Sequence, residues 1–172
     1  MVSLIHIYMT LELHDQRCVE AAEGWLGLGN WREATLELDQ ITPSMRGHPA
    51  VLCVRWGILG ASGKWEAAVE TARIITEKQP EDAWGWIQWA YSLHELKRTK
   101  EAQDVLRRVV DQFPDETTIE YNLACYCCQL GELKESRQWL ERAMAREGKK
   151  HIRELALVDP DLKPLWRELA EI

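Results

Sequence analysis

The chain has 172 residues, of which 46% are hydrophobic and 28% charged, a composition typical of a folded protein. Its formal net charge is −7, which argues against a nucleic acid or an anionic membrane as partner, because either would require a basic face. No stretch approaches the roughly 20 apolar residues of a membrane helix, and the odd number of cysteines favours reduced thiols in the cytoplasm.

Residues 1–14, MVSLIHIYMTLELH, form the first segment of the chain. They lack the basic start and the long apolar core of a secretory signal peptide. They are also too apolar for a free tail, so we expect either a short capping helix or an extended arm. Asp15 then fits the N-cap of the first helix of the repeats.

Eight helices are predicted for the following segment, in four pairs. Their expected ranges are 16–28 and 31–42, 49–61 and 64–78, 82–95 and 98–112, and 116–129 and 132–147. After Gly148 the sequence changes character and predicts a short helix, a break at Asp159-Pro160 and a last helix to Ile172. The predicted organisation is an N-terminal segment (1–14), four units (about 15–48, 49–82, 83–116 and 117–148) and a C-terminal cap (149–172).

A period of 34 residues relates the four helix pairs. Small residues recur at this step, at Ala34, Ala68, Ala102 and Ser136. Turn glycines precede them by five residues at Gly29, Gly63 and Gly131, with Lys97 as the exception. A small residue lets two helices approach closely, and glycine suits a left-handed turn. A fixed period of this size is typical of stacked helical hairpins.

These units resemble the tetratricopeptide repeat, whose signature is W-x2-L-G-x2-Y, then A-x3-F, then Pro. The third unit has the corresponding residues Trp86, Trp89, Ala90 and Leu93, then Ala102 and Leu106, then Pro114. The second unit is the least regular, because Trp56 falls where a small residue belongs, and a shift by one residue would place Gly57 there. The resemblance implies an all-α, right-handed superhelical solenoid of four TPR-like helical hairpins with a C-terminal helical cap. The closing segment resembles that of bacterial repeat proteins.

The resemblance also implies a binding groove, because the first helix of each unit lines a concave face in this family. The implied groove residues are Val19, Glu23, Leu26, Cys53, Gly57, Trp84, Ile87, Tyr91, His94, Tyr121 and Cys125. Small residues of the second unit beside large aromatics of the third predict a hollow for an apolar anchor of a partner peptide or helix. The alternative is a self-associating subunit, a homodimer that uses the groove or the N-terminal arm.

No cofactor site or catalytic constellation is apparent. Cys125 and Cys128 share a helical face, but a closed zinc site needs a second pair of ligands, so we interpret the cysteines as small buried side chains. The glycines before Lys64 have the wrong spacing for a phosphate loop. The basic cluster between Lys97 and Arg108 is interpreted as a solvated outer face. We therefore expect a cytoplasmic, non-enzymatic adaptor, scaffold or chaperone-like protein that binds a protein or peptide and no metal.

Overall fold

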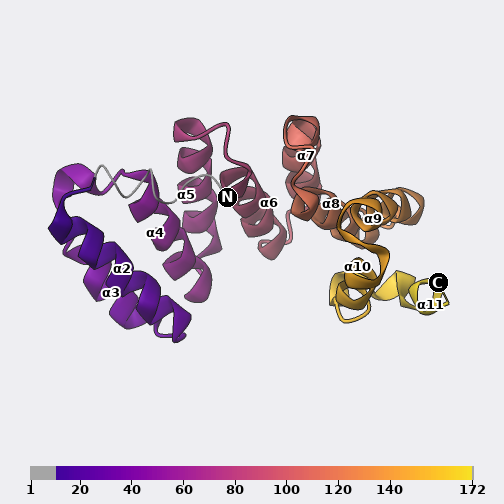
Figure 1. Cartoon of the computed structure of the whole chain (residues 1–172), viewed down its shortest axis with the longest axis horizontal. Coiled ribbons are helices and arrows are strands. Elements are labelled where there is room, and N and C mark those ends of the chain that lie inside the picture. Colours follow the sequence, from indigo (N-terminus) through magenta and orange to yellow (C-terminus); the bar gives the residue numbers. More distant parts are fainter. Residues whose placement is uncertain (1–10, 172) are drawn as a thin grey trace. The chain divides into compact units, whose positions relative to one another are not determined.

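The computed structural model describes residues 11–171, which form helices and connecting turns and no strand within that range (Figure 1). The α-helices are α2 (Leu13–Gly27), α3 (Trp31–Asp39), α4 (Pro49–Ala61), α5 (Trp65–Lys78), α6 (Ala83–Glu95), α7 (Thr99–Val109), α8 (Thr117–Gln129), α9 (Leu133–Glu147), α10 (Lys149–Ala156) and α11 (Trp166–Ala170). Three 3₁₀ segments join them, η1 (Pro43–Met45), η2 (Val110–Gln112) and η3 (Pro160–Leu165). The prediction of an all-α fold made of helical hairpins is confirmed.

The helix boundaries keep the 34-residue period of the sequence. Helices α4, α6 and α8 begin at residues 49, 83 and 117, and α3, α5, α7 and α9 begin at residues 31, 65, 99 and 133. The turn inside each hairpin also repeats, since the N–H groups of residues 30, 64, 98 and 132 donate to the carbonyls of residues 25, 59, 93 and 127. The second unit therefore needs no shift, and Trp56 occupies the position of the small residue.

Each hairpin turn contains one residue in the left-handed region of the backbone map. Its φ is +73° at Gly29, +70° at Gly63, +79° at Gly131 and +63° at Lys97. Lys97 is the only non-glycine residue with positive φ in the described part of the chain. The turn geometry is thus imposed by the hairpin, because Lys97 adopts it although a Cβ makes this conformation unfavourable.

The small residues of the repeat lie where the two helices of each hairpin pack together. Ala34, Ala68, Ala102 and Ser136 all have no exposed surface. The buried hydroxyl of Ser136 has a hydrogen-bond partner there, because its Oγ donates to the carbonyl of Ala124 at 2.7 Å. The packing explains why the sequence keeps a small side chain at this step.

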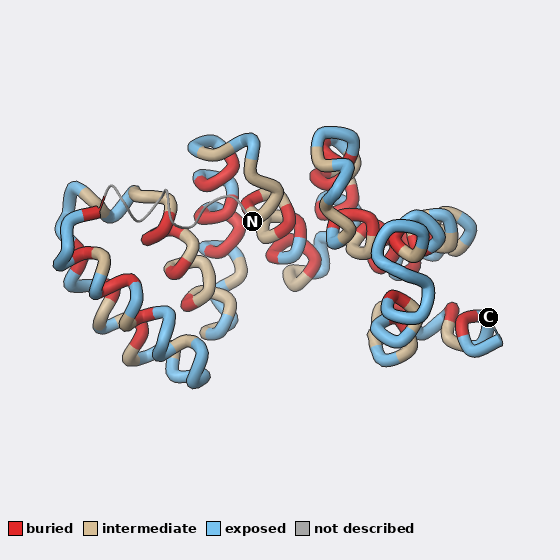
Figure 2. The backbone as a smooth tube through the Cα atoms, viewed as in Figure 1, coloured by how far each residue is buried: buried red, intermediate tan, exposed pale blue. Residues whose placement is uncertain are grey.

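The chain divides into two compact units, residues 1–85 (unit 1) and 86–172 (unit 2), and the division falls inside α6. In unit 1 the buried side chains of α2, α3 and α4 form a hydrophobic core, and buried and exposed residues alternate along these helices (Figure 2). A Cβ on Gly85 would lie 3.0 Å from the Cγ2 atom of Ile75, so this glycine lets the first turn of α6 approach α5. The predicted boundaries of the four units stay a prediction.

The start of the first helix differs from the expectation. Helix α2 begins at Leu13, two residues before the predicted cap Asp15. Asp15 is instead fully buried, and its Oδ1 accepts a hydrogen bond from the N–H of Thr42 at 2.8 Å, which fixes the segment after α3 to α2. Leu11 is buried in the same core, whereas residues 1–10 of the predicted arm lie outside the described residues.

The C-terminal segment folds against the last hairpin. Segment η3 packs on α8, and Leu162 and Leu165 are buried there. The Asp159 carboxylate accepts the N–H of Asp161 at 2.9 Å, and the Trp166 indole donates to the carbonyl of Ala156 at 2.9 Å. Among the described residues no helix is long and apolar enough to cross a bilayer.

Candidate functional site

Some of the groove residues expected in unit 1 form part of its packing. Val19 is fully buried in the core. Gly57 faces Leu26, because a Cβ added to this glycine would lie 3.0 Å from the Cδ1 atom of Leu26. A Cβ on Gly60 would meet the Trp65 ring at 3.2 Å. The chain's own side chains therefore occupy the hollow expected beside these glycines.

The remaining expected residues of unit 1 lie on and near α4. The Trp84 ring contacts Trp56 edge-on, with ring centroids 5.4 Å apart and an interplanar angle of 82°. Burial, together with the nearby carboxylates of Asp82 and Glu23, raises the pKa of the half-buried Cys53 thiol to about 12. Cys53 is therefore a protonated packing residue at neutral pH, not a nucleophile.

Unit 2 brings three expected groove residues, Tyr91, His94 and Cys125, around one pocket of about 350 Å³. The pocket is lined by α6, α8, the hairpin turn after α6 and the start of η3. Its lining residues are Tyr91, His94, Glu95, Lys97, Asn122, Cys125, Tyr126, Asp159, Pro160 and Asp161. The expected residue Ile87 is buried elsewhere in α6, and Tyr121 reaches the edge of the pocket through a hydrogen bond to Asp159.

Two aspartates of the C-terminal segment hold the expected groove residues in place. The Asp161 carboxylate lies 2.9 Å from Nε2 of His94, whose other ring nitrogen lies 3.0 Å from the Thr99 hydroxyl. The Tyr121 hydroxyl donates to Oδ2 of Asp159 at 3.0 Å. The sequence pattern predicts only a capping role for this segment, because contacts across 38 and 67 residues leave no local pattern.

Tyr126 is one of the pocket residues that the sequence pattern does not predict. Only 2% of it is exposed, its ring lies 4.9 Å from the His94 ring between centroids, and its hydroxyl has no hydrogen-bond partner among the described residues. Burial raises its pKa well above the usual value, and the carboxylate of Asp161, which lines the same pocket, raises it further. An unsatisfied buried hydroxyl costs about 1–3 kcal/mol, so Tyr126 is a destabilising feature of the wall of this pocket.

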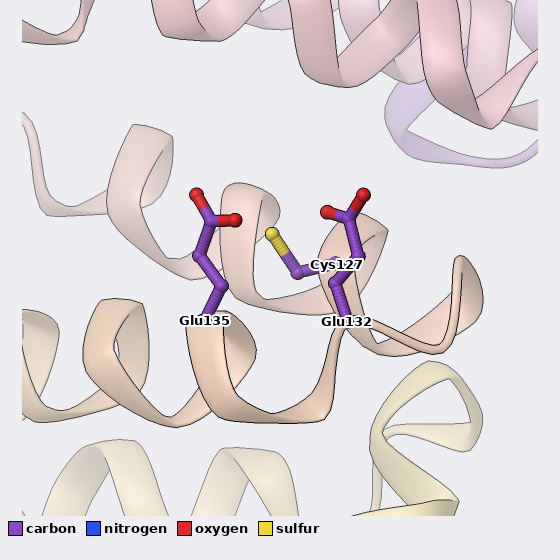
Figure 3. A group of neighbouring side chains, drawn as sticks. All are labelled: Cys127, Glu132 and Glu135. Atoms are coloured by element: carbon purple, nitrogen blue, oxygen red, sulfur yellow. The ribbon is translucent and has the colours of Figure 1, made fainter.

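A group of possible metal ligands lies outside this pocket, at Cys127, Glu132 and Glu135 (Figure 3). The guanidinium of Arg107 already lies between the two carboxylates, 3.3 Å from Glu132 and 2.8 Å from Glu135. The Gln103 amide also donates to Glu132. Burial raises the pKa of the Cys127 thiol, so it stays protonated. The chain itself supplies the cation that these carboxylates bind.

The basic cluster of α7 and the turn before it is largely paired with neighbouring acids. Arg98 pairs with Glu101 at 2.6 Å and Lys100 with Asp104 at 2.6 Å, all four with exposed side chains. Such pairs contribute little to stability and carry little free positive charge. They agree with the interpretation of this cluster as a solvated outer face.

Comparisons with known proteins support the repeat frame. A tetratricopeptide repeat family model matches residues 83–124, and the sequence matches no curated protein at a significant level. Among solved structures the chain is similar to TTC0263, a thermophilic TPR protein of Thermus thermophilus, with 17% identity and a TM-score of 0.72 over 90% of this chain and 82% of that one. It is also similar to MamA (residues 41 to the end) from Desulfovibrio magneticus RS-1, with 17% identity and a TM-score of 0.70 over 94% and 96% of the two chains. These identities are low enough that the likenesses show the fold alone. Together with the 34-residue period, these likenesses show a fold of stacked helical hairpins like that of tetratricopeptide repeat proteins, and the family model matches one such repeat at residues 83–124.

Proposed function

We propose that this chain of tetratricopeptide-like repeats is a non-enzymatic adaptor that binds a segment of a protein partner, with the pocket of unit 2 as the anchor site. Proteins of this repeat class use the surfaces formed by successive repeats to bind other proteins. The observation that carries the proposal is an exposed Tyr91 that lines one pocket together with Glu95, Asp159 and Asp161.

The lining of the pocket suits a side chain of mixed character. Tyr91 is 39% exposed and offers an aromatic wall, and aromatic residues of this kind often dominate the binding energy of an interface. Glu95, Asp159 and Asp161 bring three carboxylates to the same pocket. We therefore expect an anchor with an apolar stem and a hydrogen-bonding end, such as lysine or arginine, in place of the purely apolar anchor expected from the sequence.

The chemistry of the pocket supports binding over catalysis. Cys125 is its nucleophile candidate, and its Sγ lies 3.6 Å from Oδ2 of Asp159. Burial raises the pKa of this thiol, and the neighbouring carboxylate raises it further. A catalytic cysteine needs the opposite environment, one that stabilises the thiolate.

Site-specific photo-cross-linking tests the proposal. A benzophenone amino acid replaces Tyr91 in the full chain, and the control carries it at Leu155, which is 44% exposed on α10. We expect a discrete adduct with a partner segment from position 91 and none from position 155. The captured segment is then made as a peptide, and Tyr91→Ser should weaken its binding at least tenfold, while Leu155→Ser leaves it unchanged.

The same experiment separates the alternative of self-association. An adduct of twice the chain's mass, together with a concentration-independent dimer in light scattering, would assign this face to a homodimer. Equal adducts at both positions, or unchanged peptide affinity in Tyr91→Ser, would contradict the assignment of the pocket. Circular dichroism melts of both variants show whether a loss of binding comes from unfolding.

A further inference from the structure

A second pocket, of about 360 Å³, lies in unit 1 between α3, α4 and the segment that joins them. It is separate from the proposed anchor pocket. Its lining residues are Trp31, Thr35, Leu38, Asp39, Arg46, Arg55, Ile58, Leu59, Ser62 and Lys64. They include three cations and one anion, so the lining has a net positive charge in a chain whose net charge is −7.

Among the described residues, the three cations of this pocket lack carboxylate partners. Within residues 11–171, no ion pair involves Arg46, Arg55 or Lys64, and residues 1–10 contain no Asp or Glu. Arg46 reaches only the carbonyl of Ile41, at 3.5 Å from its Nε. By contrast, Arg73 of the same unit pairs with both Glu70 and Glu77, although its side chain is 45% exposed.

Arg55 departs from the repeat frame at this pocket. The equivalent positions of the other three units hold the apolar residues Ala21, Trp89 and Leu123. Arg55 is half-buried and belongs to the irregular part of the second unit, next to Trp56. Removing a guanidinium from water without a carboxylate partner costs free energy, and a bound anion would offset that cost.

The start of α5 adds to the positive character. Lys64 occupies the N-cap of this 14-residue helix and provides no side-chain acceptor for its first N–H groups. The equivalent residue of the first hairpin, Asn30, accepts the N–H of Glu33 at 3.3 Å. The positive end of a helix favours an anion nearby, and here it adds to the larger effect of the charged side chains that line the pocket.

We propose that this pocket binds a phosphate group. A phosphate group offers three acceptor oxygens to cationic donors, and a phosphate monoester carries a charge near −2 at neutral pH. That charge balances the net positive charge that remains when the carboxylate of Asp39 is set against the three cations of the lining. The group belongs either to a free small phosphate or to a phosphorylated side chain of a partner, since both present the same chemistry.

A titration followed by nuclear magnetic resonance tests this site in the full chain. The probes are inorganic phosphate and O-phosphoserine, each added at constant ionic strength, with sodium chloride as the reference salt. We expect saturable shifts of the Arg55 Nε–H signal and of the Leu59 amide. Arg55→Gln should weaken the binding at least tenfold, whereas the matched control Arg73→Gln in the same unit should leave it unchanged.

The outcomes separate the sources of the phosphate and can overturn the site. Tighter binding of O-phosphoserine would assign the pocket to a phosphorylated segment, and tighter binding of inorganic phosphate would assign it to a free anion. If Arg55→Gln melts at a lower temperature, Arg46→Gln combined with Lys64→Gln replaces it, because both side chains are exposed. Non-saturating shifts equal to those of chloride, or unchanged affinity in the variants, would contradict the proposal.

Discussion

The two units of the chain share one hairpin design and differ in how they neutralise charge. In unit 2, ion pairs join residues far apart in the sequence, as Arg107 does with Glu132 and Arg137 with Glu168. In unit 1, the ion pairs among residues 11–85 are those of Arg73 within α5. Unit 2 therefore uses its charges to hold helices together, whereas unit 1 leaves three cations unpaired at a pocket.

This difference shows that a repeated backbone does not repeat its chemistry. Both units have the same turns and the same buried small residues, which come from positions that recur every 34 residues. The charged residues do not follow that period, so each unit pairs them, or leaves them unpaired, in its own way. The following variants test this comparison, from the largest expected effect to the smallest.

The largest effect is expected for the buried carboxylate of unit 2. Glu120 is 3% exposed, and its Oε1 accepts from Arg142 at 3.0 Å and from Arg146 at 3.1 Å. The Glu120→Ala variant removes the carboxylate to which Arg142 and Arg146 donate hydrogen bonds. We expect a loss of about 2 kcal/mol in the free energy of unfolding, below the range for a fully buried pair because both arginines are partly exposed.

Urea denaturation measures this loss, with Glu101→Ala as the control. Glu101 also pairs with an arginine, Arg98, but on the surface at the start of α7. We expect no measurable change for that variant. If the two variants lost the same free energy of unfolding, the long-range ion pairs of unit 2 would stabilise it no more than a surface pair does, which would contradict the comparison with unit 1.

A smaller effect is expected from the turn residues that the two units do not share. Lys97→Gly should stabilise unit 2 by about 1 kcal/mol, because glycine adopts positive φ without a Cβ clash. Gly63→Ala should destabilise unit 1 by about the same amount for the same reason. Both changes are read from thermal unfolding.

Lys97→Ala serves as the control for this pair, since it removes the lysine side chain and keeps the Cβ. It should leave the stability close to that of the parent chain. A gain equal to that of Lys97→Gly would assign the effect to the charge of Lys97 and not to its backbone conformation.

The smallest effect concerns the pH dependence of unit 1. His48 caps α4, because its Nδ1 accepts the N–H of Ala50 at 3.3 Å. Burial lowers the pKa of His48 below its usual 6.5, and Lys78 lowers it further. Below pH 6.5 the unfolded chain therefore takes up this proton more readily than the folded one, so the stabilisation present at pH 7.5 is lost as the pH falls.

His48→Asn keeps a capping acceptor that does not titrate. We expect the variant to lose about 0.5 kcal/mol less than the parent chain between pH 7.5 and pH 5, as measured by urea denaturation at both values. His151→Asn, at an exposed position on α10, is the matched control and should behave like the parent. An identical pH dependence in His48→Asn and the parent would show that this cap does not titrate as described.

The repeat frame allowed most of the fold to be predicted, and less of the candidate site. The start of α4 at Pro49 and the buried positions of Ala34 and Ala68 follow from the period, because helix starts, turns and close packing depend on residues near one another in the sequence. The same frame predicts that Tyr91 and His94 line a groove, which stays a prediction, whereas the pocket that they line also needs Asp159 and Asp161 of the C-terminal segment. The filling of the space at Gly57 by Leu26 does not follow from this frame, since these residues belong to different hairpins.

By itself, the sequence determined the all-α hairpins, their turns and the column of small residues, since each depends on local backbone geometry and on side-chain size at a fixed step. Only the tertiary structure showed that Asp15 holds the loop at Thr42, that Asp161 reaches His94, and that Arg55 faces a pocket without a carboxylate partner. These features depend on which charged and polar groups meet across large separations in the chain. The position of a residue in the repeat does not specify which distant charged or polar group it will contact.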